Sequence, residues 1–119
     1  MNRKECNFIN SVSEGAEIVR LVDHPNIRLL ADFYHMAREG ESAQAIADAG
    51  ELLYHCHIAE KDKRTPPGVA KDDFRPYFEA LKQINYQGAV SIECGWSNFK
   101  QQLPEAIDNM QEQLFSINL

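Results

Sequence analysis

Three short apolar runs along the chain each close on a polar, chemically active side chain. The runs cover residues 27–32, 53–58 and 89–93, and they close on Asp32, His57 and Glu93. Runs of this length, nearly continuous in apolar residues, are typical of parallel strands that are buried on both faces. The pattern therefore predicts three strands at these positions.

The segments around these strands show helical spacing of apolar positions. The order helix–strand, repeated three times and closed by a last helix, favours parallel strands joined by right-handed crossovers. Each repeat takes about 30 residues, as βα units do. The predicted helices cover residues 13–22, with Ser13 as the cap, about 42–50, a stretch from Asp72 or Asp73 to about 84, and about 103–116, with Pro104 in its first turn.

This order predicts an α/β fold of about three parallel strands alternating with four helices. A free-standing sheet of three parallel strands exposes unpaired backbone groups at both edges. A (β/α)8 barrel typically takes about 250 residues, and this chain has 119. Two architectures are therefore open: a small doubly wound domain, or part of a TIM barrel that needs a partner to close it.

Composition narrows the possible partners. The net charge of −6 and the pI near 5.1 argue against a surface that binds nucleic acid. The three cysteines show no CxxC spacing, so we expect free thiols in a reducing cytoplasm. The sequence has neither a signal-peptide-like start nor an apolar run of membrane-spanning length, and we expect a cytoplasmic protein that does not bind a membrane.

The strand ends predict a metal site. Functional side chains of parallel α/β folds gather where strands end, and alternation along each strand turns Asp32, His57 and Glu93 to one face. Carboxylate and imidazole ligands suit Mn, Mg, Co or Zn. Leu30, His55 and Ser91 are expected on the same face, and Ala31, Cys56, Ile58 and Ile92 on the face toward the helices.

Simpler interpretations of the same residues remain open. A carboxylate that closes a strand is commonly a helix cap, and a histidine in an apolar run is commonly a core residue with satisfied hydrogen bonds. His35 is open to interpretation as a turn cap. Trp96 fits a pocket lining and a loop cover equally well.

Three stretches, in order, resemble a known family: "NRKECNFINSVSEGAEIVRLVDHPNIRLLADFYHM", "HCHIAEKDKRTPPG" and "SIECGW". They are similar to the xylose isomerase-like TIM barrels, which include sugar and keto-sugar epimerases and isomerases, hydroxypyruvate isomerase, inosose dehydratase and endonuclease IV-like (AP endonuclease family 2) enzymes. The DxxHM motif at 32–36 and the HxHIA motif at 55–59 carry most of the likeness. The resemblance covers residues 1–119 and implies the C-terminal half of the family's barrel, an incomplete domain.

The resemblance also implies roles for single residues. Asp32, His57 and Glu93 would bind a divalent metal, Glu93 serving also as a catalytic acid/base. The expected activity is isomerisation or epimerisation of a sugar or keto-acid through an enediolate. The residues expected to contact substrate are His35, Arg64 and Glu5, with Arg3 nearby.

Two positions depart from the family's pattern. A further metal-binding glutamate of the family, its second acid/base, would stand three residues before Asn2, a position that precedes Met1. The family's PGxG loop is written PPGVA here, with Ala70 at the second glycine. A truncated gene product, a misassigned start codon and a half-barrel that pairs with another half are all compatible with this pattern.

The sequence thus leads to one main functional hypothesis and two alternatives. The main hypothesis is a metal-dependent sugar isomerase or epimerase-like protein, truncated and with doubtful activity on its own. One alternative is a fragment of an endonuclease IV-like nuclease, which the acidic composition disfavours. The other is a non-catalytic half-barrel that self-associates, because exposed sheet edges favour a homo-oligomer or a separate N-terminal half.

Overall fold

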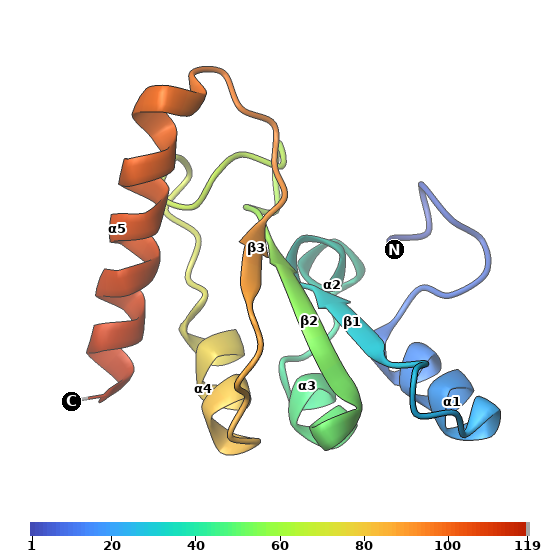
Figure 1. Cartoon of the computed structure of the whole chain (residues 1–119). Coiled ribbons are helices and arrows are strands. Elements are labelled where there is room, and N and C mark those ends of the chain that lie inside the picture. Colours follow the sequence, from blue (N-terminus) through green and yellow to red (C-terminus); the bar gives the residue numbers. More distant parts are fainter. Residues whose placement is uncertain (119) are drawn as a thin grey trace.

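A computed structural model describes residues 1–118, so the last residue of the expected 1–119 domain lies outside the described part. Its centre is a parallel sheet in the order β1-β2-β3, made of β1 (Leu29–Asp32), β2 (Leu53–Ile58) and β3 (Val90–Ile92). In Figure 1, α1 lies beyond β1 on one side and α5 stands beyond β3 on the other. The helices are α1 (Val12–Val22), α2 (Phe33–Glu39), α3 (Gln44–Ala49), α4 (Arg75–Gln83) and α5 (Phe99–Asn118), with a 3-10 turn η1 (Gly50–Leu52) before β2.

The α/β class and the three parallel strands are confirmed, but the expected number of four helices is wrong. Helix α2 is an addition to the predicted elements, since the sequence pattern predicts a strand over 27–32 and no helix directly after it. Asp32 is in fact the N-cap of α2, and Gly40 ends that helix with a left-handed backbone at φ 68°. Both are ordinary helix signals.

Three predicted helix starts also shift. Helix α1 is capped by Ser11, in a capping box with Glu14, and not by Ser13. Helix α4 begins after Phe74 without a side-chain cap. Helix α5 begins at Phe99, which places Pro104 inside the helix and not in its first turn.

One face of the sheet forms the core with the helices. Ala31, Cys56 and Ile58 are fully buried there, as the alternation along the strands predicted. Phe33, at the start of α2, stacks on Tyr77 of α4 with ring centroids 4.6 Å apart, which joins α2 and α4 on this face of the sheet. This packing fixes the strand ends relative to one another.

The other face of the sheet is open. Leu30 is 45% exposed on this face, and His57 and Glu93 are partly exposed beside it. Within residues 1–118, β1 and β3 each pair only with β2, so the sheet is an open segment and not a closed barrel. None of the helices in this range is long and apolar enough to span a bilayer.

Candidate functional site

The carboxyl ends of the three strands bring Asp32, His57 and Glu93 together. Each offers one ligand atom, and these atoms lie within 4.8 Å of one another. His57 Nδ1 is 3.7 Å from Asp32 Oδ2 and 3.3 Å from Glu93 Oε2. The parallel register explains the convergence. Asp32 of β1 lies beside His57 of β2, and Ser91 of β3 lies beside His57 on the other side. Glu93, two residues after Ser91, points to the same face of the sheet as Ser91.

Asp32 uses its two oxygens differently. Oδ1 accepts hydrogen bonds from the backbone N–H groups of Tyr34 and His35, at 3.0 and 3.4 Å, and so caps α2. Oδ2 faces the site, 3.7 Å from His57 Nδ1 and 4.0 Å from Arg64 Nη2. The two interpretations of this residue, helix cap and site carboxylate, therefore both describe its geometry.

His35 is buried, and its tautomer follows from its neighbours. Its Nδ1 accepts a hydrogen bond from the backbone N–H of Asn2 at 3.0 Å, so the neutral ring carries its hydrogen on Nε2. Nε2 lies 3.7 Å from Asp32 Oδ2 and 3.9 Å from Glu5 Oε2. Burial lowers the pKa of His35, although the charge of Asp32 opposes this shift. His35 thus presents an N–H donor at the edge of the site.

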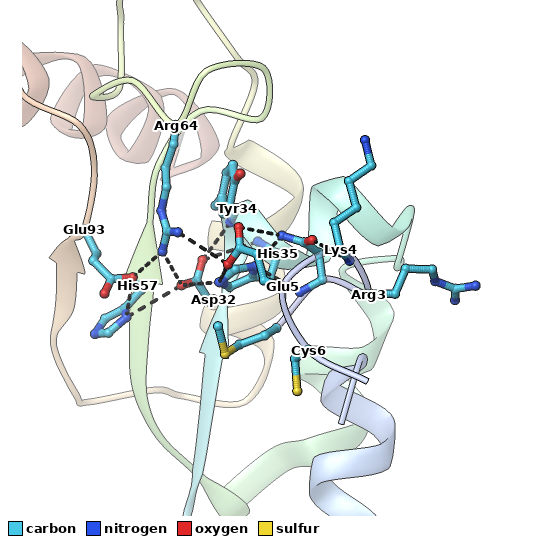
Figure 2. A network of polar contacts seen from close by, with 12 residues as sticks. Arg3, Lys4, Glu5, Cys6, Asp32, Tyr34, His35, His57, Arg64 and Glu93 are labelled. Carbon is cyan, nitrogen blue, oxygen red and sulfur yellow. Dashed lines mark hydrogen bonds and ion pairs between the residues drawn. The ribbon is translucent and has the colours of Figure 1, made fainter. Parts of the chain in front are cut away.

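Arg64 places a cation against the acidic cluster (Figure 2). Its Nη2 donates to Glu93 Oε2 at 2.7 Å, and its Nη1 lies 3.8 Å from Glu5 Oε2. The guanidinium also lies over the ring of Tyr34, 4.5 Å from its centroid. Partial burial raises the pKa of Glu93, but the hydrogen bond from Arg64 and the charge of His57 outweigh it, so the pKa is lowered overall. Glu93 is accordingly a carboxylate at neutral pH.

These groups line a cavity of about 280 Å³. Its polar end holds Asp32, His35, His57, Arg64 and Glu93, and its apolar wall comes from the N-terminal segment, α1 and β1. A volume of this size is at the small end of ligand pockets.

The donor set fits a divalent cation. Ligand atoms about 2.1 Å from an ion and at right angles to each other are about 3 Å apart. His57 Nδ1 is close to that spacing from each carboxylate, at 3.3 and 3.7 Å, and all three ligand atoms lie within 4.8 Å of one another. Two carboxylates and one imidazole suit Mn, Mg, Co or Zn. The three protein ligands leave further coordination positions for water or substrate oxygens.

Sequence reasoning missed three residues that shape this site. Asn2 fixes the tautomer of His35, Tyr34 supports Arg64, and the buried Glu60 organises the loop that carries Arg64. All three lie inside the stretches that carry the family resemblance, and Tyr34 stands within the DxxHM motif itself, but the sequence pattern assigned none of them a role. Arg3, expected near the sugar, instead pairs with Glu39 at 2.8 Å and points away from the site in Figure 2.

Two smaller expectations have clear outcomes. Ala70 replaces a glycine of the family pattern without strain, because its backbone is not among the positive-φ positions. Trp96 is half-buried and packs edge-to-face on Phe99, with centroids 5.1 Å apart, which makes it a cover for the start of α5.

Comparison with known proteins points to one family. A family model described as "Xylose isomerase-like TIM barrel" matches residues 1–114. The chain is 37% identical over 94 residues to 3-dehydro-D-guloside 4-epimerase of Escherichia coli, which covers 78% of this chain and 36% of the relative. It is also 37% identical over 94 residues to D-psicose 3-epimerase of Ruminiclostridium cellulolyticum, covering 78% of this chain and 32% of the relative. The matched part of the chain therefore spans about a third of the length of these relatives.

Solved structures give the same picture. The fold matches D-psicose 3-epimerase with D-tagatose from Clostridium cellulolyticum with a TM-score of 0.81 at 30% identity, over 97% of this chain and 46% of that one. It matches 3-keto-D-glucoside 4-epimerase from E. coli with a TM-score of 0.80 at 31% identity, over 90% of this chain and 41% of that one. The sheet in Figure 1 is thus a segment of a TIM barrel.

Proposed function

We propose that this chain, which belongs to the xylose isomerase-like TIM barrel family, carries the metal and proton-transfer half of a ketose epimerase or isomerase site. The observation that carries the proposal is the meeting of Asp32, His57 and Glu93 at adjacent strand ends. The names of the relatives support a sugar or a small keto compound as the substrate. The whole activity, including its substrate, is part of the proposal.

Asp32, His57 and Glu93 are the residues that would hold a divalent cation. Such an ion supplies Lewis acidity toward a carbonyl oxygen, which lowers the pKa of the neighbouring C–H. The sheet holds the three side chains from separate strands, so their positions do not depend on one flexible loop. That rigidity favours a fixed geometry for the reacting carbon.

Glu93 is the residue in place to move the proton. Its pKa is lowered, so it is an unprotonated base at neutral pH, and its side chain is 52% exposed at the mouth of the site. Removal of a proton from the hydroxyl-bearing carbon next to a carbonyl gives an enediolate. Return of a proton to the opposite face of that carbon gives the epimer, and return to the former carbonyl carbon gives the isomer. Arg64 modulates this base directly through the 2.7 Å hydrogen bond.

His35, Arg64 and Glu5 are positioned to orient a polyol. The N–H at His35 Nε2 and the guanidinium of Arg64 are donors to substrate oxygens, and Glu5 offers an acceptor between them. Donors and acceptors of this kind align the reacting carbon with the base before the chemical step.

The test separates binding from chemistry. Titrate the chain with Mn²⁺ or Co²⁺ by calorimetry, and compare it with the double variant Asp32→Ala/His57→Ala, which we expect to lose the binding. Then incubate the metal-loaded chain with D-psicose, D-fructose or D-tagatose in D₂O and follow the C–H signals by NMR. Exchange at the carbon next to the carbonyl needs only one base, so Glu93 suffices for it. Unchanged metal affinity in the double variant contradicts the proposal, as does the absence of exchange with every ketose.

A second proposal concerns assembly. Within residues 1–118, β1 and β3 each have one paired edge, and exposed sheet edges attract further strands. We propose that a further set of barrel strands, from another copy or from a separate N-terminal half, covers these edges. Sedimentation velocity over a range of concentrations tests this, and a monomer at every concentration with no bound partner opposes it.

A further inference from the structure

Glu60 is a fully buried carboxylate that the proposed chemistry does not use. It lies two residues beyond the end of β2 and three residues after His57, and it is 0% exposed. A buried charge is tolerated only when hydrogen bonds replace its hydration. Four neutral donors do so: Thr65 Oγ1 at 2.7 Å and the N–H of Ala70 donate to Oε2, and the N–H groups of Gly68 at 2.9 Å and Asp72 at 3.3 Å donate to Oε1.

These donors all come from the loop that carries Arg64. Pro66 and Pro67 in the same loop are nearly fully buried, and Gly68 has a φ of 101°, a conformation that favours glycine. The backbone N–H of Glu60 also donates to the carbonyl of Thr65 at 2.9 Å. Glu60 therefore closes the loop from both its side chain and its backbone.

Arg64 stands inside that closed loop in an unfavourable backbone conformation. Its φ of 55° is in the left-handed region, which a residue with a Cβ avoids unless its surroundings enforce it. Its carbonyl accepts a hydrogen bond from the N–H of Gly95 at 2.8 Å, which fixes it beside the end of β3. This backbone position directs the guanidinium onto Glu93.

We propose that Glu60 is a positioning residue that holds Arg64 against Glu93. It thereby sets how much positive charge faces the carboxylates of the site. A carboxylate is needed because both oxygens only accept; an amide in its place would turn N–H groups toward the N–H groups of the loop. All hydrogen bonds of Glu60 within residues 1–118 go to the loop, so it acts on the site through Arg64.

The mobility of the Arg64 side chain tests this without metal or substrate. The variant is Glu60→Gln, and the measurement is ¹⁵N relaxation of the arginine Nε–Hε groups. Arg75 is the internal control, because its guanidinium pairs with Asp73 at 2.8 Å at the end of the same loop. We expect Glu60→Gln to make Arg64 mobile and leave Arg75 unchanged, and the matched variant Asp73→Asn to do the reverse.

Two results overturn the proposal. One is a folded Glu60→Gln protein in which Arg64 relaxes as in the parent; a role of Glu60 in packing alone predicts this result. The other result concerns Thr65→Val, which removes one donor and keeps the carboxylate, and it is needed if Glu60→Gln does not fold. Increased Arg64 mobility in Thr65→Val supports the proposal, and unchanged mobility overturns it.

The consequence for metal binding rests on the proposed function and has a separate readout. Release of Arg64 from Glu93 moves a cation away from an oxygen that would bind the divalent ion, so Mn²⁺ affinity should rise by about tenfold. Arg64→Ala should give a similar rise, and the double variant Glu60→Gln/Arg64→Ala no further rise. Additive effects, or a fall in affinity in Glu60→Gln, contradict the coupling. A parent chain that binds no Mn²⁺ contradicts the proposed function, while the relaxation result for Glu60 stands.

Discussion

The two oxygens of Asp32 allow two of its contributions to be separated by mutation. Oδ1 caps α2 through the N–H groups of Tyr34 and His35, whereas Oδ2 faces His57 and the cation site. Asp32→Asn keeps an oxygen that can cap the helix but removes the anionic ligand. Asp32→Ala removes both. The pair therefore distinguishes a helix cap from a metal ligand at the same position.

The expected magnitudes follow from this geometry. Loss of an N-cap costs about 1 kcal/mol, which for a domain of this size corresponds to a Tm lower by about 3–5 °C. We expect Asp32→Ala to show this loss in metal-free buffer, and Asp32→Asn to stay within about 0.5 kcal/mol of the parent. Both variants should bind Mn²⁺ more than about 100-fold more weakly, because each lacks one of three protein ligands.

The assay is paired calorimetry and thermal unfolding. Mn²⁺ titration gives the affinity, and unfolding with EDTA and with saturating Mn²⁺ gives the stability with and without metal. The metal should raise the Tm of the parent and leave both variants unchanged. Parent-like Mn²⁺ affinity in Asp32→Asn would refute the ligand role. Equal metal-free stability of the Ala and Asn variants would refute the cap.

Further predictions concern charge, backbone and thiols. Arg64→Ala should tighten Mn²⁺ binding by about tenfold in calorimetry, because it removes a cation paired with Glu93; weaker binding contradicts this electrostatic argument. Gly68→Ala should lower the free energy of unfolding more than Gly40→Ala, since both have positive φ but only Gly68 has a neighbour, 3.3 Å from the added Cβ; equal losses in denaturant titrations would exclude that steric term. At pH 7.5 Cys6 should react with a disulfide reagent before the buried Cys56, because backbone hydrogen bonds lower the pKa of Cys6 and burial raises the pKa of Cys56 to about 11. Since only the thiolate reacts, raising the pH should speed both reactions. Faster labelling of Cys56 than of Cys6 at pH 7.5 would contradict the lowered pKa of Cys6 and the raised pKa of Cys56.

Several sequence-based predictions hold because they depend on local pattern. The three strands appear where apolar runs were found, and the alternation along β2 puts Cys56 and Ile58 on the helix side. The family assignment is confirmed by the match over residues 1–114. Helix α2 was missed although Asp32 and Gly40 marked both of its ends, because the segment after the strand 27–32 was expected to be a loop. Cytoplasmic localisation, a homo-oligomer and the endonuclease alternative stay predictions, the last of which can be tested by incision of abasic-site DNA at low salt.

The sequence by itself determined the order of the three strands, the helices between them apart from α2, and the residue type at each strand end. Parallel strands in register must bring their carboxyl ends to one edge, so the meeting of Asp32, His57 and Glu93 followed from topology. Which side chains around the site are buried, and which charges pair with each other, was decided only by the tertiary structure. Glu60 and Arg64 belong to the charged stretch "EKDKR", whose composition is typical of a solvent-exposed loop. In the folded loop, however, Glu60 is completely buried and Arg64 pairs with Glu93. Burial and hydrogen bonding depend on which backbone groups the folded loop brings to a side chain, and neither composition nor periodicity encodes that.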